Sequence, residues 1–239
     1  MIGFFRGPMK AVSQLVFRLA SLSLALLLAV QCLWLVLPEM LRPAIDWLPT
    51  NAVASAARTA ARGPAAWAAA IAIIRGDLWA ESAYTYSDLL WDKAVPNAEI
   101  TQGLPRAGAR LDRALADAPH QSSAWLFRAA LGLHYPSENI DVLESLRMSY
   151  YTGPSERQLM PLRLRAMMQL DITGDVEMRQ FASRDLRSLV TQKQTSAIAN
   201  AYGGASPAGK RFIEQGIRDI DPAMVQSLQS AATGSSPAN

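Results

Sequence analysis

Apolar residues recur along this chain at the spacing of a helix, and no stretch alternates apolar and polar residues as a half-buried strand does. Three apolar stripes follow one another between residues 64 and 119, each bounded by glycine or proline. Their members are Trp67, Ala70, Ile71 and Ile74; Trp79, Ala83, Tyr86 and Leu90; and Leu104, Ala107, Leu111, Ala114 and Leu115. The pattern predicts an all-α fold.

Proline, glycine and serine place the helix ends that we expect in this half of the chain. Pro64 suits a helix N-terminus, because its missing N–H has no partner there. Gly76 suits the left-handed residue that ends that helix. Residues 96–103 are expected to form a loop, and Ser122 or Ser123 is expected to cap the helix that follows Pro119.

Further helices are predicted in the second half of the chain. The residue pair Ser155 and Gln158 has the spacing of a capping box. Asp175 and the pair Ser206-Pro207 mark two later helix starts. The expected helices cover residues 122–133, 140–151, 156–170, 175–192, 198–202 and 206–220, with a short one from residue 221.

Residues 19–37, LASLSLALLLAVQCLWLVL, carry no charge. At 1.5 Å per residue they span about 28 Å, close to the roughly 30 Å of a bilayer core. Three basic residues precede this run: Arg6, Lys10 and Arg18. In the first 20 residues after it, only Arg42 is basic. The sequence therefore predicts one transmembrane helix in the inner (cytoplasmic) membrane, with a cytoplasmic N-terminus and a periplasmic C-terminal domain.

Cleavage, lipidation and a buried soluble helix are the alternatives to this anchor. The apolar run is longer than the core of a typical signal peptide, and the nearest small-x-small triplet, residues 54–56, lies far beyond it. Gln31 precedes Cys32, where a lipoprotein needs a small residue. We therefore favour an uncleaved anchor. The predicted order is a basic N-terminus (1–18), the anchor (19–37), a juxtamembrane connector (38–63), a helical domain (64–230) and a disordered tail (231–239).

The helical domain contains a spacing that occurs twice. Trp67 precedes Pro96 by 29 residues, and Trp125 precedes Pro154 by the same interval. This resembles the tetratricopeptide repeat, a helix–turn–helix unit with an early tryptophan, small residues in its second helix and a closing proline. The resemblance covers roughly residues 64–170 and implies a stack of helical hairpins. The residues implied to pack between repeats are Trp67, Ala83, Ala107, Ala114, Pro119, Trp125 and Pro154.

The chain also departs from the repeat pattern. Asp141 occupies a position where the family has a small residue, and residues 91–103 do not make a good first helix. Beyond Pro154 only helical periodicity remains. An irregular helical bundle is therefore the alternative architecture.

In repeat proteins of this kind the first helix of each hairpin lines a concave face. The resemblance thus implies a groove for a protein partner, lined by Leu126, Ala130, Leu133, Met160, Leu164, Met167 and Met168. Methionine side chains adapt to apolar partners, which supports this role. The alternative is that these residues are ordinary core. Nearby, Arg157, Arg163 and Arg165 are interpreted as a solvated face.

Charge and composition narrow the chemistry. The chain has 23 basic and 20 acidic residues; without Arg6, Lys10, Arg18 and Glu39 around the anchor, 20 and 19 remain. Such a neutral domain argues against nucleic-acid binding. One cysteine and two histidines, His120 and His134, cannot assemble a zinc knuckle, and no nucleotide-binding or hydrolase motif occurs. We expect no catalytic, cofactor or metal site; acids such as Asp219 would need a cleft to act as catalysts.

The sequence thus favours a non-enzymatic, membrane-anchored periplasmic scaffold or adaptor that binds protein partners in cell-envelope assembly, such as polysaccharide export or cytochrome maturation. The envelope context is an analogy with the architecture of such proteins, and a fold alone does not determine function. The alternative is a structural accessory subunit of an inner-membrane complex, in which Ser23 and Gln31 form hydrogen bonds to neighbouring membrane helices.

Overall fold

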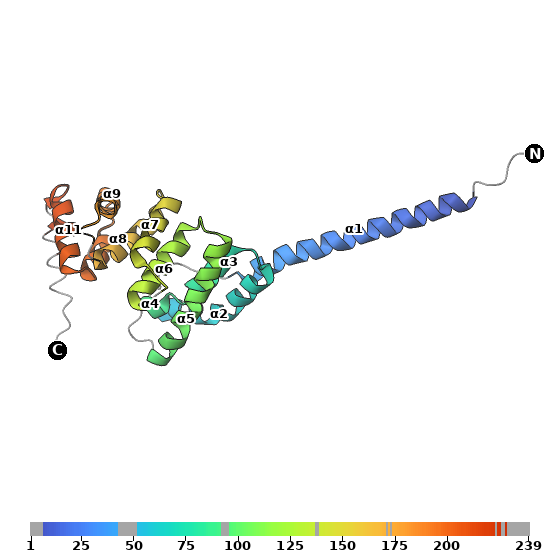
Figure 1. The fold of residues 1–239 in the computed structure, drawn as a ribbon, viewed down its shortest axis with the longest axis horizontal. Helices are drawn as coiled ribbons and strands as arrows, with labels where there is room; N and C mark the ends of the chain where they lie inside the picture. The colour runs from blue at the N-terminus through green and yellow to red at the C-terminus, as the bar shows by residue number, and fades with distance from the viewer. Residues whose placement is uncertain are drawn as a thin grey trace, which may run out of the picture.

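The structure is a computed structural model that describes residues 7–42, 52–91, 96–136, 139–170, 172, 174–222, 224–225 and 228. Every regular element in these ranges is a helix, so the predicted all-α fold is confirmed. One long helix projects from a body of shorter helices (Figure 1). The tetratricopeptide arrangement of this body remains a prediction, and the predicted tail 231–239 lies outside the described residues.

Helix α1 (Gly7–Leu41) is longer at both ends than the predicted anchor. Its segment Gln14–Leu41 contains 28 residues, reaches a mean hydropathy of 2.3 and has its apolar side chains outside the body. It is long and apolar enough to cross a membrane.

Helix α2 (Ala52–Ala72) begins inside the predicted connector, so the prediction that the helical domain starts at residue 64 is wrong. Pro64 lies within this helix and removes one backbone hydrogen bond from it. The surrounding sequence is rich in alanine, the strongest helix former, which offsets this cost.

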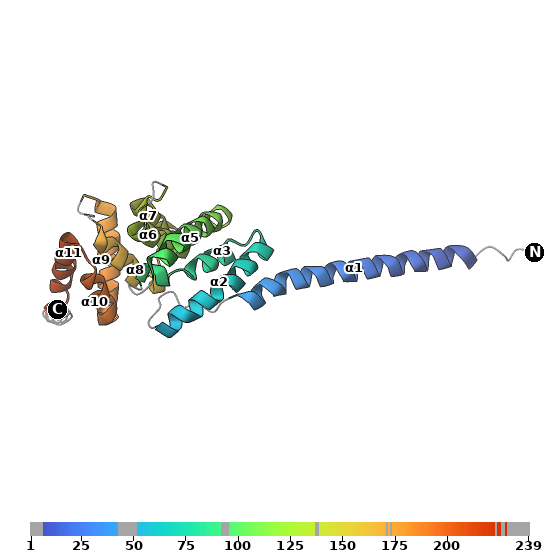
Figure 2. The same cartoon turned by 90° about the horizontal axis from the view of Figure 1, so that it is seen from below.

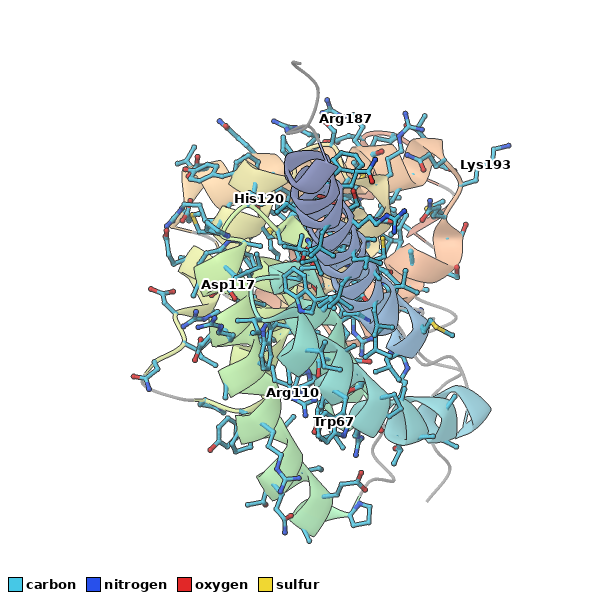
Figure 3. All side chains as sticks on the ribbon, turned by 90° about the vertical axis from the view of Figure 1, so that its right-hand side faces the viewer. Trp67, Arg110, Asp117, His120, Arg187 and Lys193 are labelled. Atoms are coloured by element: carbon cyan, nitrogen blue, oxygen red, sulfur yellow. The ribbon has the colours of Figure 1, made fainter. Side chains whose placement is uncertain are left out.

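Helix α2 buries the face opposite to the predicted one. The contacts to its neighbours are made by Ala65, Ala68, Ala69 and Ala72, all nearly inaccessible to solvent. Trp67 and Ile74 are 68% and 70% exposed. Trp67 therefore does not pack between repeats, and Figure 3 labels it on the side of the body from which α1 projects. Alanine is small enough to let α2 approach α1 and α3 closely, and that selects the alanine face.

The turn after α2 is made by Ile73, in the left-handed region at φ 44°, and not by Gly76. A β-branched residue there costs roughly 1–3 kcal/mol. The Ile73 carbonyl accepts weak bonds of 3.4 Å from Trp79 Nε1 and from Arg113 Nη2. Gly76 instead begins α3 (Gly76–Tyr84), where a Cβ atom would lie 2.7 Å from the Ala114 carbonyl oxygen. The missing side chain of Gly76 therefore permits close contact between the start of α3 and the helix that contains Ala114.

Helix α4 (Asp88–Trp91) is short, and α5 (Asn97–Asp117) includes most of the predicted loop 96–103. The apolar stripe expected in α5 is confirmed, since all five of its members are buried. Arg62 of α2 joins these elements: its guanidinium lies 2.8 Å from the buried Asp88 carboxylate and stacks over the Tyr86 ring.

Helices α6 (Ser122–His134) and α7 (Val142–Thr152) pack along each other. Trp125 is half-buried, and its Nε1 donates to the Pro119 carbonyl at 2.7 Å, which fastens α6 to the end of α5. Neither serine caps α6, because the N-cap is Gln121 and makes no side-chain bond. Asp141 caps α7 by accepting the Glu144 N–H at 2.9 Å, which explains an acid at a position where the repeat has a small residue.

A short 3-10 helix, η1, replaces the expected capping box at Ser155 and Gln158. The helix starts predicted at Asp175 and Ser206 are confirmed: these side chains accept the N–H groups of Met178 and Gly209 at 3.0 and 3.1 Å. The elements of this half are η1 (Arg157–Leu159), α8 (Met160–Gln169), α9 (Val176–Thr191), α10 (Thr195–Gly203) and α11 (Pro207–Arg218). Figure 2 shows them at the end of the body remote from α1.

Candidate functional site

The residues predicted to line a partner groove form part of the hydrophobic core. Leu133 is partly buried, and the other six, Leu126, Ala130, Met160, Leu164, Met167 and Met168, are at most 7% exposed. The reason is that α6, α9, α10 and α11 pack around α8 and bury its apolar side chains. The predicted groove is therefore wrong at these residues, and the alternative of an ordinary core is confirmed.

The predicted repeat-packing residues divide into two groups. Ala83, Ala107 and Ala114 are fully buried between helices, as small packing residues are. Pro119 and Pro154 are exposed, like Trp67. The exposed prolines end helical segments and make no core contacts of the kind that the repeat implies.

A wide cleft lies over α9, between η1 and α11. It is open to solvent and has a volume of about 1030 Å³. Its lining is polar and basic, and consists of Arg157, Val176, Arg179, Gln180, Ser183, Arg184, Arg187, Ser188, Thr191, Gln192, Phe212 and Gln215. We call this surface the arginine cleft.

Helix α9 positions most of these side chains. It buries an apolar face against α8 and α11, with Ala182, Leu186 and Leu189 in the core. The opposite face carries Arg179 and Arg187, which lie eight residues, or about 12 Å, apart along the helix. The amphipathic pattern of α9 therefore presents a row of guanidinium groups to solvent.

The cleft carries positive charge because its arginines form no ion pair with a described acid; Arg184 interacts with the buried carboxylate of Asp185 only at longer range. Among the described residues, Arg157, Arg179, Arg184 and Arg187 make no ion pair, and no acid lines the cleft.

The nearest acids of α9 are already paired. The carboxylates of Asp175 and Glu177 lie 2.9 and 3.3 Å from the Arg147 guanidinium. The Met178 N–H and Arg147 hold the pKa of Asp175 below its usual value. Glu177 also accepts the Tyr151 hydroxyl at 2.8 Å. These carboxylates therefore do not neutralise the cleft.

Apolar and amide groups complete the lining. Val176 is 59% exposed, and Phe212 contributes an aromatic ring from α11. A smaller hollow of about 240 Å³ shares Ser183, Arg187, Phe212 and Gln215 and extends the cleft along α11, where Asp219 adds one acid to the lining. Guanidinium and amide donors beside apolar side chains suit a carboxylate-bearing peptide.

A buried charged network supports α9 from below. Arg163 of α8 is fully buried; its Nη1 donates to the Gly153 carbonyl at 2.9 Å, and its guanidinium stacks 4.5 Å from the Tyr150 ring centre. The Tyr150 hydroxyl donates to Asp185 Oδ2 at 2.6 Å. Burial raises the pKa of Asp185 to about 6. The interpretation of Arg163 as part of a solvated face is wrong.

The arginine cleft is not among the predicted sites, because periodicity predicts the α9 helix but not which of its charged side chains stay outside ion pairs. The signal was available: Arg179, Ser183 and Arg187 recur every four residues opposite an apolar stripe. His120 and His134 lie near the ends of different helices. Within the described ranges, no group of three or more His, Cys, Asp or Glu side chains is placed to hold a metal ion.

Comparisons with known proteins find no family model, no curated protein and no solved structure that matches this chain.

Proposed function

We propose that this protein is a membrane-anchored helical scaffold that binds an acidic segment of a protein partner in the arginine cleft. Helix α1 is the single membrane span, and the body is a periplasmic, tetratricopeptide-like domain. Assembly of the cell envelope, such as polysaccharide export or cytochrome maturation, is the context that this architecture suggests.

The arginine cleft is the observation that carries this proposal. An exposed arginine outside any ion pair is common, but four around one concavity create a local positive potential in a body that is nearly neutral overall. Guanidinium groups bind carboxylates through paired hydrogen bonds. Val176 and Phe212 offer apolar contact beside them, so a peptide with both acidic and apolar side chains fits better than a nucleic-acid backbone.

Charge reversal in the cleft tests this function. In the full-length protein in nanodiscs, Arg179→Glu with Arg187→Glu is expected to weaken binding of a labelled amphipathic peptide, with glutamates at i and i+4, by at least about tenfold. Fluorescence anisotropy measures the binding. The matched control, Arg106→Glu with Arg218→Glu, changes net charge equally at exposed positions outside the cleft.

Three outcomes would contradict the proposal. One is equal binding of a peptide with lysine in place of glutamate. Another is equal loss of binding in the two charge-reversed proteins, since that would make net charge the cause. The third is preferential binding of single-stranded nucleic acid, which would reassign the cleft to another partner.

The proposed orientation has a separate test. Arg18 precedes the uncharged run 19–37 of α1, and we expect the C-terminus on the opposite side of the membrane from this basic end. A C-terminal reporter that is active only outside the cytoplasm should be active, and intact mass should show an uncleaved chain. Activity of a cytoplasm-only reporter would exclude the periplasmic placement, and a shortened chain would exclude the anchor.

A further inference from the structure

An apolar patch at the end of α2 is left outside the body; we call it the apolar stripe. Trp67 lies on the exposed side of α2, and Ile73 and Ile74 follow in the turn to α3. Their exposed fractions are 68%, 57% and 70%. The described residues do not cover these three side chains. Exposed apolar patches of this kind mark surfaces that meet another apolar phase.

A hydrogen bond fixes this stripe beside the apolar part of α1. Trp34 Nε1 donates to the Ile71 carbonyl at 2.9 Å. Because Ile71 lies in the last turn of α2, its carbonyl has no acceptor role within the helix and is free for this bond. Trp34 precedes Glu39 by five residues, so the end of α2 reaches about 7.5 Å past Glu39 towards the uncharged segment of α1.

Charged residues lie closer to the body than the contact between Trp34 and Ile71. Arg75, at the start of α3, pairs with Glu39 of α1, and Arg42 pairs with Glu81 of α3. The change from apolar to charged surface therefore occurs at the same level on α1 and on the corner between α2 and α3. Figure 2 shows this corner beside the body-side end of α1.

We propose that the corner between α2 and α3, with Trp67, Ile73 and Ile74, is seated in the interfacial layer of the bilayer that α1 crosses. The inference rests on the proposed membrane anchor. Helices of this kind bury their apolar face about 5–10 Å into the boundary between headgroups and acyl chains, and tryptophan is enriched in that layer. Lipid is the occupant because the stripe continues the apolar surface of α1 at the same depth.

Site-specific labels in the full-length protein test whether the corner between α2 and α3 contacts the lipid; we call this contact the seat. Cys32→Ser removes the only cysteine, and single cysteines are then placed at Ile74, at Leu27 in α1 and at Ile220 at the far end of the body. Each variant, labelled with an environment-sensitive fluorophore, is reconstituted in vesicles with or without lipids brominated near the top of the acyl chain. We expect loss of emission and a blue shift at Ile74, and neither at Ile220.

The Leu27 label separates the two proposals. Quenching by deeply brominated lipid at Leu27, with Ile74 no more quenched than Ile220, would overturn the seat and leave the anchor intact. No quenching at Leu27 would overturn the anchor itself. A label at Ile74 that is shielded from iodide but insensitive to brominated lipid would show cover by protein and would also overturn the seat.

A second position guards against a local effect of the label. A cysteine at Trp67 lies four residues before Ile71, about 6 Å further along α2 towards the body. Its label is expected to be quenched by shallow bromines more than by deep ones. Unchanged thermal unfolding of the labelled variants shows that the body remains folded, and a Trp67 label that behaves like the Ile220 label would contradict the proposal.

Discussion

Truncation of Arg163 to alanine is expected to lower the free energy of unfolding by about 3–5 kcal/mol. The guanidinium is fully buried and donates to the Gly153 carbonyl, to the Ser149 hydroxyl and to the Ser149 carbonyl. Without it these buried groups keep only their weaker or single remaining bonds, from the Gly153 and Glu156 N–H groups and to the Ser122 carbonyl. The truncation also leaves a cavity over the Tyr150 ring and removes the positive charge near Asp185.

Urea unfolding of the full-length protein in detergent, followed by circular dichroism, measures this effect. Arg157→Ala is the matched control, since Arg157 is exposed and its truncation should change stability by no more than about 0.5 kcal/mol. Arg163→Lys should recover only part of the loss, because an ammonium group cannot make the same fork of hydrogen bonds. Equal stability of the two alanine variants would contradict the network.

The protein is expected to lose up to about 3 kcal/mol of stability between pH 4 and pH 7 through Asp185 alone, because a pKa change of one unit corresponds to about 1.4 kcal/mol. Burial raises the pKa of Asp185 from 3.8 to about 6. The folded protein therefore holds this proton more tightly than the unfolded chain. The stability that protonated Asp185 provides is present below about pH 4 and is lost as the pH rises through 6.

The measurement is the difference between the wild type and Asp185→Asn in urea unfolding at several pH values. The pKa values of Asp77 and Asp175 are lowered, so their contributions have the opposite sign and must be cancelled in this way. The groups that face Asp185 are Tyr150 and Arg163, with Arg184 from its own helix. Asp112→Asn, which neutralises an exposed carboxyl in the same way, is the matched control substitution. Parallel curves for the wild type and Asp185→Asn would contradict the raised pKa.

Helical periodicity predicted the fold class and several helix starts correctly, because these depend on local chemistry. Asp175 and Ser206 cap their helices with side-chain bonds to N–H groups three residues later, which sequence spacing alone reveals. The α5 stripe was also predictable, since its large and small apolar residues share one face.

The buried face of α2 was not predictable by the same means. Periodicity identifies two candidate faces, one with Trp67 and Ile74 and one with alanines. Side-chain size favours burying the first, but the short distances between α2 and its neighbours admit only the second. That choice depends on helices that are distant in sequence.

The predicted groove failed for a related reason. Met167 and Met168 look adaptable from their chemistry, but helices α10 and α11, which follow much later, cover them. The spacing of the cleft arginines is visible in the sequence, but whether acids neutralise them is not. Asp175 and Glu177 are close enough in sequence to pair with Arg179, but in the structure both carboxylates pair with Arg147.

Helices α9 and α11, which line the arginine cleft, lie at the opposite end of the body from α1 (Figure 1). If α1 anchors the protein as proposed, a partner free in the aqueous compartment would dock directly. A partner rooted in the same membrane would need a tether at least as long as the body, so the proposed scaffold would discriminate by the height of the binding segment above the lipid as well as by its charge.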